Sequence, residues 1–264
     1  MSKKMTMRNM QHGDYTLLAP DYARHRPAYS DTVLKAIIGL IGKDARKIHA
    51  VDVGAGTGIW TRMVSRQGCG VTAIEPNDEM RKFGIAHDEA STIRWLKGKA
   101  EETGLPRNCC DLVTMASSFH WTKFDKAAKE FNRILKTGGW FAALWNTRSL
   151  ENNPLLVEIE NKLKTIVPDL KRVSSGKSEF CATLRERLYQ CGRFKDVLYI
   201  EGRHSERMAP ARYIGIWRSV NDVYVQAGRV RFEEFMDYLR ERLHTVKYID
   251  AVYLTRAWIA QVNK

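Results

Sequence analysis

Between residues 33 and 147 the sequence alternates short β-forming runs with amphipathic helical stretches, and this alternation constrains the fold more than any other feature. The four clearest β-forming runs are "KIHAVDVG" (47–54), "GVTAIEP" (70–76), "CDLVTMAS" (110–117) and "WFAALWNT" (140–147). Glycine and proline end the first two runs, as is usual for strands. Because strand, helix and strand follow one another, we expect an α/β fold with a mostly parallel sheet and helices on both faces.

The clearest helix in this part is "TKFDKAAKEFNRIL" (122–135), which a basic residue and two glycines close. After residue 148 the pattern changes to longer helices, a polar loop over 170–180 and two further strands. The helices are predicted over 153–167, 181–191, 210–224 and 231–246, and the strands over 194–204 and 251–260. Tyr213, Trp217, Val220 and Tyr224 share one stripe of the third of these helices, which favours a buried core.

The composition indicates a soluble, intracellular protein. With 264 residues and 44% hydrophobic content the chain can bury a large core. "MSKKMTMRNM" is basic, but no apolar run follows it, and no stretch approaches the ~18 apolar residues of a membrane span. The five cysteines, including the adjacent Cys109 and Cys110, lack zinc-site spacing, so we expect free structural thiols, a cytoplasmic location and no bound metal.

The net charge of +13 suggests an acidic partner, which a nucleic acid, an anionic membrane surface or an anionic small molecule would provide. Lys and Arg outnumber Asp and Glu by 22 to 15 in residues 1–147, and by 21 to 15 in residues 148–264. The excess is therefore spread along the chain with no basic tail. This distribution argues against a dedicated nucleic-acid arm, while a folded basic face remains compatible with it.

"VDVGAGTG" is the strongest local motif, because Gly54, Gly56 and Gly58 follow a strand directly and lead into a helix. Glycines allow a tight turn that brings backbone N–H groups against a ligand at a helix N-terminus. A dinucleotide fingerprint would require glycine where this chain has Ile59, and a P-loop would require Gly-Lys-Ser/Thr, which is also absent. The motif therefore predicts a ligand site without the groups that hold a phosphate chain.

Glu75 lies 17 residues beyond Gly58, at the end of the next predicted strand. A carboxylate at this place can accept both hydroxyls of a ribose, as an acidic residue does in nucleoside-binding α/β folds. Together with the glycine loop it predicts an adenosine ligand that lacks a phosphate chain. S-adenosylmethionine meets this description.

These motifs resemble those of the class I S-adenosylmethionine-dependent methyltransferases, and the similarity covers almost the whole chain. "VDVGAGTG" resembles the first motif of the family, "AIEPNDEM" its ribose-binding motif, and "CDLVTMASSFHW" its fourth strand. "EFNRILKTGGWFAALWN" resembles the following helix and fifth strand. "YARHRPAY", "FHW" and "WN" are similar to a small-molecule branch that includes trans-aconitate methyltransferase-like carboxyl O-methyltransferases.

The resemblance implies a Rossmann-like sheet of about seven strands with the last strand antiparallel beside the fifth. It implies a single domain with N-terminal cap helices (1–46), a cofactor-binding core (47–147) and a C-terminal part (148–264) that carries strands and a helical lid. The residues that it places at the cofactor are Tyr22, Arg24, Asp52, Gly54, Ala55, Gly56, Gly58, Glu75, Pro76, Met80, Ala100, Glu101 and Ser117.

Within this set, Tyr22 and Arg24 would close over the methionine carboxylate, and Met80 would pack on the adenine. Asp52 would anchor the loop, or the amino group of the cofactor through water. Many relatives have an acidic residue where this chain has Lys99, and a lysine cannot accept a hydrogen bond from adenine. We therefore expect Ala100 and Glu101 to take that role.

The methyl acceptor is expected to meet His120, Trp121, Trp145, Trp217 and Arg218. His120 has two interpretations. It is a substrate-orienting wall residue if the acceptor is a carboxylate, which is ionised at neutral pH, and a general base if the acceptor is an amine or phenol. Six arginines between residues 203 and 231 are either a solvated surface or include one, best Arg218, that turns inward to an anionic acceptor.

The favoured hypothesis is O-methylation of a small, carboxylate-bearing molecule. The alternatives are an RNA or protein methyltransferase, suggested by the charge, N-methylation of a small amine, and a cofactor-binding protein without catalysis. No RNA-binding module is appended, and the "NPPY"-type motif of base methylation is absent after the fourth strand. We expect no membrane partner and no specific nucleic-acid binding.

Overall fold

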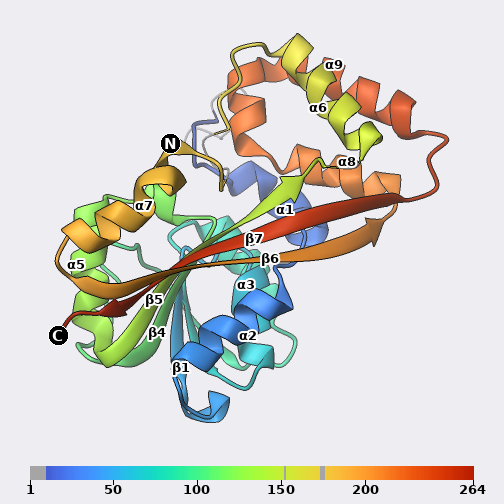
Figure 1. The fold of residues 1–264 in the computed structure, drawn as a ribbon. Helices are drawn as coiled ribbons and strands as arrows, with labels where there is room; N and C mark the ends of the chain where they lie inside the picture. The colour runs from blue at the N-terminus through green and yellow to red at the C-terminus, as the bar shows by residue number, and fades with distance from the viewer. Residues whose placement is uncertain (1–9, 152, 173–175) are drawn as a thin grey trace, which may run out of the picture. The chain divides into compact units, whose positions relative to one another are not determined.

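The computed structural model describes residues 10–151, 153–172 and 176–264. The chain divides into two compact units, each made of three separate segments (Figure 1). The sheet unit consists of residues 28–147, 174–204 and 254–264, and the helical unit of 1–27, 148–173 and 205–253. The first residues of the predicted cap and part of the predicted 170–180 loop lie outside the described residues.

A seven-stranded sheet in the order β3-β2-β1-β4-β5-β7-β6 carries the sheet unit. Its strands are β1 (His49–Val53), β2 (Gly70–Ile74), β3 (Ile93–Leu96), β4 (Cys110–Ala116), β5 (Leu135–Ser149), β6 (Phe194–Met208) and β7 (Ile249–Val262). The first five are parallel, with β1 pairing Ala50 to Val71 of β2 on one side and to Leu112 of β4 on the other. The predicted parallel α/β fold is confirmed.

The last strand, β7, lies between β5 and β6 and runs antiparallel to both (Figure 1). This confirms the place predicted for "AVYLTRAWIA". Strand β3 has only four residues, and its "IRWL" lies among polar and charged neighbours, which is why periodicity alone does not reveal it. Strands β5, β6 and β7 are longer than predicted, and the chain passes from one unit to the other within each of them.

Helices cover both faces of this sheet (Figure 1). They are α2 (Asp31–Leu40), α3 (Ile59–Arg66), α4 (Asp78–Ala86), α5 (Phe124–Ile134) and α7 (Glu179–Gln190), with the short helices η3 (Ala45–Lys47) and η4 (Phe119–Trp121). Side chains alternate along each strand, so β5 sends Phe141 to the core under α5 and α7, and Ala142 to the core under α2 and α3. These two apolar layers hold the strand ends in place.

The helical unit has its own core. Its helices are η2 (Thr16–Leu18), α1 (Ala19–His25), α6 (Pro154–Ile166), α8 (Pro210–Arg218) and α9 (Asn221–Leu243). The predicted stripe of Tyr213, Trp217, Val220 and Tyr224 is buried, as expected. The single helix predicted over 210–224 is wrong, because the chain leaves helical geometry after Arg218, and α9 itself kinks at Gly228 (φ 70°, ψ 169°).

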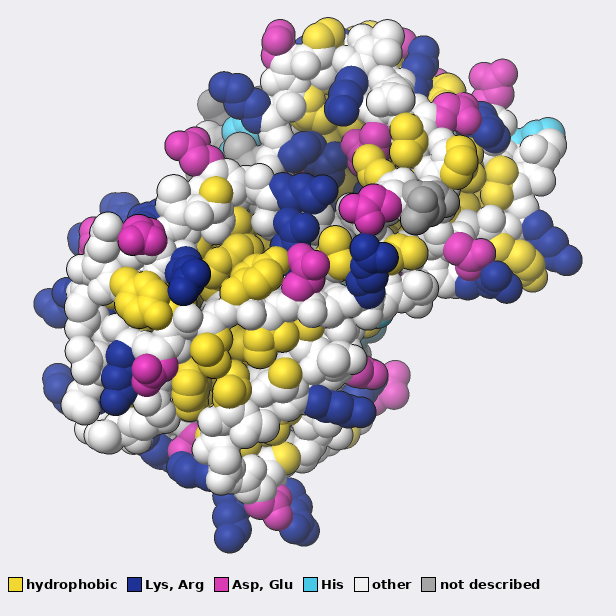
Figure 2. Space-filling view, viewed as in Figure 1, with side chains coloured by type: hydrophobic (Ala, Val, Ile, Leu, Met, Phe, Trp, Pro, Cys, Tyr) yellow, Lys and Arg dark blue, Asp and Glu magenta, His cyan; other side chains and the backbone are white. Residues whose placement is uncertain are grey.

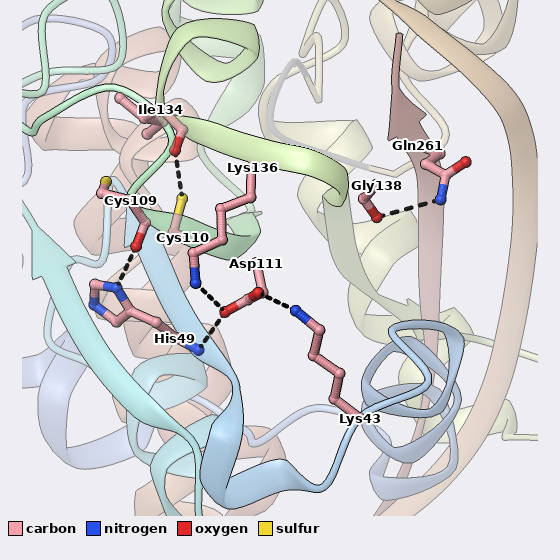
Figure 3. Close-up of polar contacts among 9 residues, drawn as sticks. All are labelled: Lys43, His49, Cys109, Cys110, Asp111, Ile134, Lys136, Gly138 and Gln261. Carbon is pink, nitrogen blue, oxygen red and sulfur yellow. Dashed lines mark hydrogen bonds and ion pairs between the residues drawn. The ribbon is translucent and has the colours of Figure 1, made fainter. Parts of the chain in front are cut away.

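At the amino ends of β1 and β4, a buried carboxylate joins three segments of the sheet unit (Figure 3). Asp111, with only 2% of its side chain exposed, binds the Lys43 Nζ at 2.6 Å and the Lys136 Nζ at 3.0 Å, and accepts the His49 N–H at 3.0 Å. Burial would raise the pKa of the Asp111 carboxyl, but these donors outweigh it and lower the pKa to about 2. Both oxygens of the Asp111 carboxylate are therefore occupied by protein donors.

No helix in the described part of the chain is long and apolar enough to cross a membrane. On the face shown in Figure 2, Lys and Arg side chains occur on many parts of the surface, several of them next to one another near its centre, and Asp and Glu side chains lie among them. All five cysteines are free thiols. Within the described ranges, no three His, Cys, Asp or Glu side chains gather in a way that would hold a metal ion.

Candidate active site

The glycine loop connects β1 to α3 at the carboxyl end of the parallel strands. Gly54, Gly56 and Gly58 all have left-handed φ, between 59° and 78°, a region that only glycine adopts without strain. A Cβ on Gly54 would lie 2.7 Å from the Ser118 Oγ, and one on Gly58 2.9 Å from the Trp95 ring. The backbone conformation therefore favours glycine at all three positions, and crowding adds to this preference at Gly54 and Gly58.

Glu75 ends β2 and reaches back to the loop. One carboxylate oxygen accepts the Gly56 N–H at 2.8 Å, and the other accepts the Asn77 N–H at 2.8 Å. Burial raises the pKa of Glu75, while these two N–H groups and Arg81 oppose that rise. A carboxylate has about four acceptor positions, so each oxygen of Glu75 keeps capacity for a further donor. Two adjacent hydroxyls on a ribose match that capacity.

Asp52 lies beneath the loop and is 1% exposed. Its carboxylate accepts the Thr61 hydroxyl at 2.6 Å and the Thr114 hydroxyl at 2.9 Å, so it ties β1 to α3 and to β4. Burial raises the pKa of Asp52 to about 7, since these neutral donors compensate it only in part. Of the two roles predicted for Asp52, anchoring has the supporting contacts.

The other predicted cofactor residues of this unit lie on neighbouring turns. Pro76 is exposed just after Glu75, and Met80 is buried on α4, with its methyl near the Gly56 position. Ala100 is buried, and Glu101 accepts the Lys123 N–H at 2.7 Å. Pro76 and Ala100 follow β2 and β3 along the chain, and the roles of all four residues toward adenine stay a prediction.

Two hydroxyl contacts near the loop were not anticipated from the sequence. Ser117, which has a left-handed φ of 56°, lies with its Oγ 3.0 Å from the Tyr29 hydroxyl. Ser118 donates to the Val53 carbonyl at 3.2 Å. Tyr29 follows the "YARHRP" segment, and its contact with Ser117 connects it with the end of β4. No local pattern in the sequence signals this pair.

His120 lies in the turn after β4, where Trp145 controls its orientation. The Trp145 indole N–H donates to the His120 Nδ1 at 3.2 Å, and the His120 ring centroid lies 4.5 Å from that of Trp121, which is 38% exposed. Because an indole N–H can only donate, Nδ1 must accept, and the neutral imidazole carries its hydrogen on Nε2. Burial lowers the pKa of His120 to about 4, so this neutral form dominates at pH 7.

The His120 Nε2 is buried and has no hydrogen-bond partner among the residues that the structure describes. Burying a donor without an acceptor is unfavourable, and such groups are rare in native proteins. A ligand that offers an acceptor would satisfy it. The site therefore presents an N–H at the carboxyl end of β4, not a free imidazole lone pair.

The predicted site residues of the helical unit have a mixed outcome. Tyr22 packs on Tyr15 and carries the Arg26 guanidinium over its ring, while Arg24 is exposed, so their closure over the cofactor stays a prediction. Trp217 is fully buried in the core of its unit. Arg218 is exposed at the end of α8 and does not turn into that core, because the burying stripe of α8 passes through Trp217 instead.

The cations that do face this core come from outside the predicted arginine cluster. The Arg148 guanidinium lies 4.5 Å from the Trp217 ring centroid and the Arg172 guanidinium 5.6 Å from it. Arg148 directly follows "WNT" at the carboxyl end of β5, and that position is the signal that sequence reasoning overlooked.

Comparison with known proteins agrees with this geometry. Residues 51–143 match the family model described as "Methyltransferase domain". An uncharacterized methyltransferase of Mycobacterium bovis is 35% identical over 127 residues, which are 48% of this chain and 49% of that protein. The ubiquinone/menaquinone biosynthesis C-methyltransferase of Rubrivivax gelatinosus is 33% identical over 36% of this chain and 38% of its own. The chain thus spans about half the length of the first curated relatives that it matches, or less.

Solved structures share the fold over a greater length. A protein from Anaeromyxobacter dehalogenans assigned as a type II methyltransferase superposes with a TM-score of 0.67 at 18% identity, covering 89% of this chain and 97% of that one. The phosphoethanolamine N-methyltransferase 2 of Haemonchus contortus, solved with S-adenosylhomocysteine, has a TM-score of 0.54 at 14% identity, covering all of this chain and 62% of that one. Residues 51–143 thus match a methyltransferase domain, and most of the chain shares the fold of these solved structures.

Proposed function

We propose that this protein transfers a methyl group from S-adenosylmethionine to a small acceptor that carries a carboxylate, by O-methylation. The observation that carries the cofactor assignment is the buried Glu75 carboxylate, fixed by two backbone N–H groups beside three glycines. A carboxylate at this place suits the hydroxyls of a ribose as a hydrogen-bond acceptor, and its charge would repel a phosphate chain. The bound S-adenosylhomocysteine in the Haemonchus structural neighbour is consistent with it.

In this proposal the cofactor supplies a methyl group on a sulfonium, and the protein orients the acceptor. Gly54, Gly56 and Gly58 would admit the methionine part, and Glu75 would hold the ribose. The His120 N–H would donate to an oxygen of the acceptor and so align it for in-line displacement. No proton has to be removed from an ionised carboxylate, and the site needs no base.

The alternative of N-methylation with His120 as general base is disfavoured by two properties of this residue. Its pKa of about 4 leaves a weak base, far from the pKa near the working pH that general-base catalysis favours. The Trp145 N–H also occupies the Nδ1 lone pair, so the neutral ring has no lone pair left to accept a proton. The C-methyltransferase relative makes carbon a third acceptor atom, which product analysis would identify.

The test is calorimetric titration of the full chain with S-adenosylhomocysteine, with NAD as the comparison ligand, followed by incubation with labelled cofactor and a panel of acids. We expect S-adenosylhomocysteine to bind and NAD not to, and the product to be a base-labile ester. Binding of NAD alone would refute the cofactor assignment. Label in an amine or on carbon would refute O-methylation and leave the cofactor assignment intact.

RNA is tested separately as a methyl acceptor, because the net charge of +13 suggests a nucleic-acid partner. Binding to phosphates releases counterions and therefore weakens steeply with salt. We expect only weak RNA binding that is lost at physiological salt, and no label in RNA. Tight binding with methyl incorporation would establish the nucleic-acid alternative instead.

A further inference from the structure

We propose that Arg148 in the helical unit is a binding site for a single carboxylate of the acceptor, a site that no motif assigns. The proposal rests on the methyl-transfer function above and deepens it by naming the residue that selects an acidic substrate. Arg148 is the second-last residue of β5, and it belongs to the helical unit.

The side chain of Arg148 is held in one orientation by two buried aromatic residues. Its Nη1 donates to the Tyr213 hydroxyl, and the guanidinium lies 5.0 Å from the Tyr213 ring centroid and 4.5 Å from that of Trp217. Both rings are fully buried, so they cannot move aside easily. A guanidinium stacked in this way offers its edge to a ligand, and that edge fits a carboxylate bidentately.

This edge lacks an acceptor within the protein. The Arg148 Nε is buried and has no hydrogen-bond partner in the part of the chain that the structure describes. No Asp or Glu of that part forms an ion pair with Arg148, and residues 1–9, 152 and 173–175, outside the description, contain no Asp or Glu. A partly buried cation without a contacting anion is unusual, because buried charges are normally paired.

The neighbouring acids are already engaged by the other arginine on the same ring. Arg172 binds the Glu160 carboxylate at 3.4 Å and the Asp222 carboxylate at 3.7 Å. Glu160 is near enough to favour the charge on Arg148, so the local charges balance in number. The contacts of the two arginines nevertheless differ, because both carboxylates contact Arg172. One uncontacted cation matches one negative charge, which favours a carboxylate over a doubly charged phosphate.

The experiment compares Arg148→Lys, which keeps the charge but loses the planar fork, with Arg242→Ala. Arg242 is a matched control, because it belongs to the same unit and Glu158 already occupies its guanidinium at 2.7 and 2.8 Å. Binding is measured by calorimetry in the presence of S-adenosylhomocysteine. The probes are acetate, benzoate, decanoate and trans-aconitate, the neutral methyl ester of each, and inorganic phosphate.

At least one carboxylate is expected to bind the wild type, its methyl ester much more weakly, and Arg148→Lys should weaken that carboxylate about tenfold or more. Arg242→Ala should leave it unchanged. The carboxylate site is refuted if no acid binds, if Arg148→Lys binds equally well, if phosphate binds more tightly than any acid, or if Arg218→Ala alone removes binding. Unchanged affinity of every variant for S-adenosylhomocysteine shows that they fold and separates this failure from failure of the methyltransferase assignment.

Discussion

Buried carboxylates at the two ends of the parallel strands in the sheet unit have pKa values that are shifted in opposite directions. At the amino end, Asp111 is surrounded by Lys43 and Lys136, and its pKa is lowered to about 2 (Figure 3). At the carboxyl end, Asp52 and Glu75 are buried to a similar degree, yet their pKa values are raised. Burial raises the pKa values of Asp52 and Glu75, and only hydroxyl and N–H groups contact their carboxylates, whereas two lysines contact Asp111.

This contrast separates a structural role from a binding role. A carboxylate paired with lysines stabilises the fold, and protein cations already occupy the oxygens that a ligand would contact. A buried carboxylate that only neutral donors contact lowers the stability of the fold. Groups with perturbed pKa values are concentrated at functional sites. The unpartnered His120 Nε2 lies at the same carboxyl end. We therefore expect substitutions at the carboxyl end to change binding, and substitutions at the amino end to change stability.

The largest effect is expected for Glu75→Ala. The loss of two charge-assisted hydrogen bonds of about 1.5–3 kcal/mol each corresponds to a loss of about 100-fold or more in S-adenosylhomocysteine affinity. Calorimetry measures it, with Glu79→Ala as the control, because Glu79 lies in the first turn of α4, close to Glu75 in the chain, and forms an ion pair with Lys82 at 4.0 Å. Equal affinity of Glu75→Ala and wild type would mean that the raised pKa of Glu75 does not indicate a ribose site.

Asp111→Asn is expected to lower the free energy of unfolding by about 2 kcal/mol, because two charge-assisted contacts at a buried oxygen pair are lost. Both lysines are more than two-fifths exposed and can return to water, which keeps the loss moderate. Urea unfolding measures it, and S-adenosylhomocysteine affinity should stay at the wild-type value. A variant with normal stability and weakened cofactor binding would reverse the roles of the two ends.

Asp52→Asn should change the pH dependence of stability. Because the folded-state pKa is raised to about 7, the folded chain keeps a proton that the unfolded chain loses near pH 4, and stability falls as pH rises between these values. The slope from Asp52 is at most about 1.4 kcal/mol per pH unit. Urea unfolding at pH 5, 6, 7 and 8 should show a flatter curve for Asp52→Asn than for wild type. Asp111→Asn should leave the slope unchanged in this window, and a flatter curve there too would contradict the comparison.

The smallest effect is expected at His120. As a donor to the acceptor it should be replaceable in part by Gln, so His120→Gln should retain more activity than His120→Ala, whose loss should be about tenfold or less. A general base would instead cost about 10²–10⁴-fold. The wild-type rate should be flat between pH 6 and 8, because the pKa of about 4 lies well below this range.

Nitrogen NMR of histidine-labelled protein provides a reading of His120 that is independent of activity. The wild type should show the Nε2–H form, and Trp145→Phe should remove that preference, because it deletes the N–H that donates to Nδ1. A sigmoid pH–rate profile that disappears in His120→Ala would establish a base.

Residues that act within one strand-turn-helix segment could be predicted from the sequence. The glycine loop and Glu75 belong to this class, because short spacing along the chain and the strand ends bring them to one edge of a parallel sheet. The four strands of the core and helix α5 were equally accessible, since each buries a regular pattern. The same reasoning failed between α8 and α9, where nothing in "WRSVND" marks the break after Arg218.

Contacts between distant segments were outside the reach of any local pattern. Whether His120 offers a lone pair or an N–H depends on Trp145, 25 residues away, and the chemical meaning of the motif "FHW" changes with it. The same holds for Arg148, whose aromatic neighbours come from α8, more than 60 residues later. Periodicity and spacing therefore specify the sheet and the glycine loop, because these depend on local backbone preferences. Protonation, tautomer and unpaired charge depend on burial and on partners that packing alone brings together.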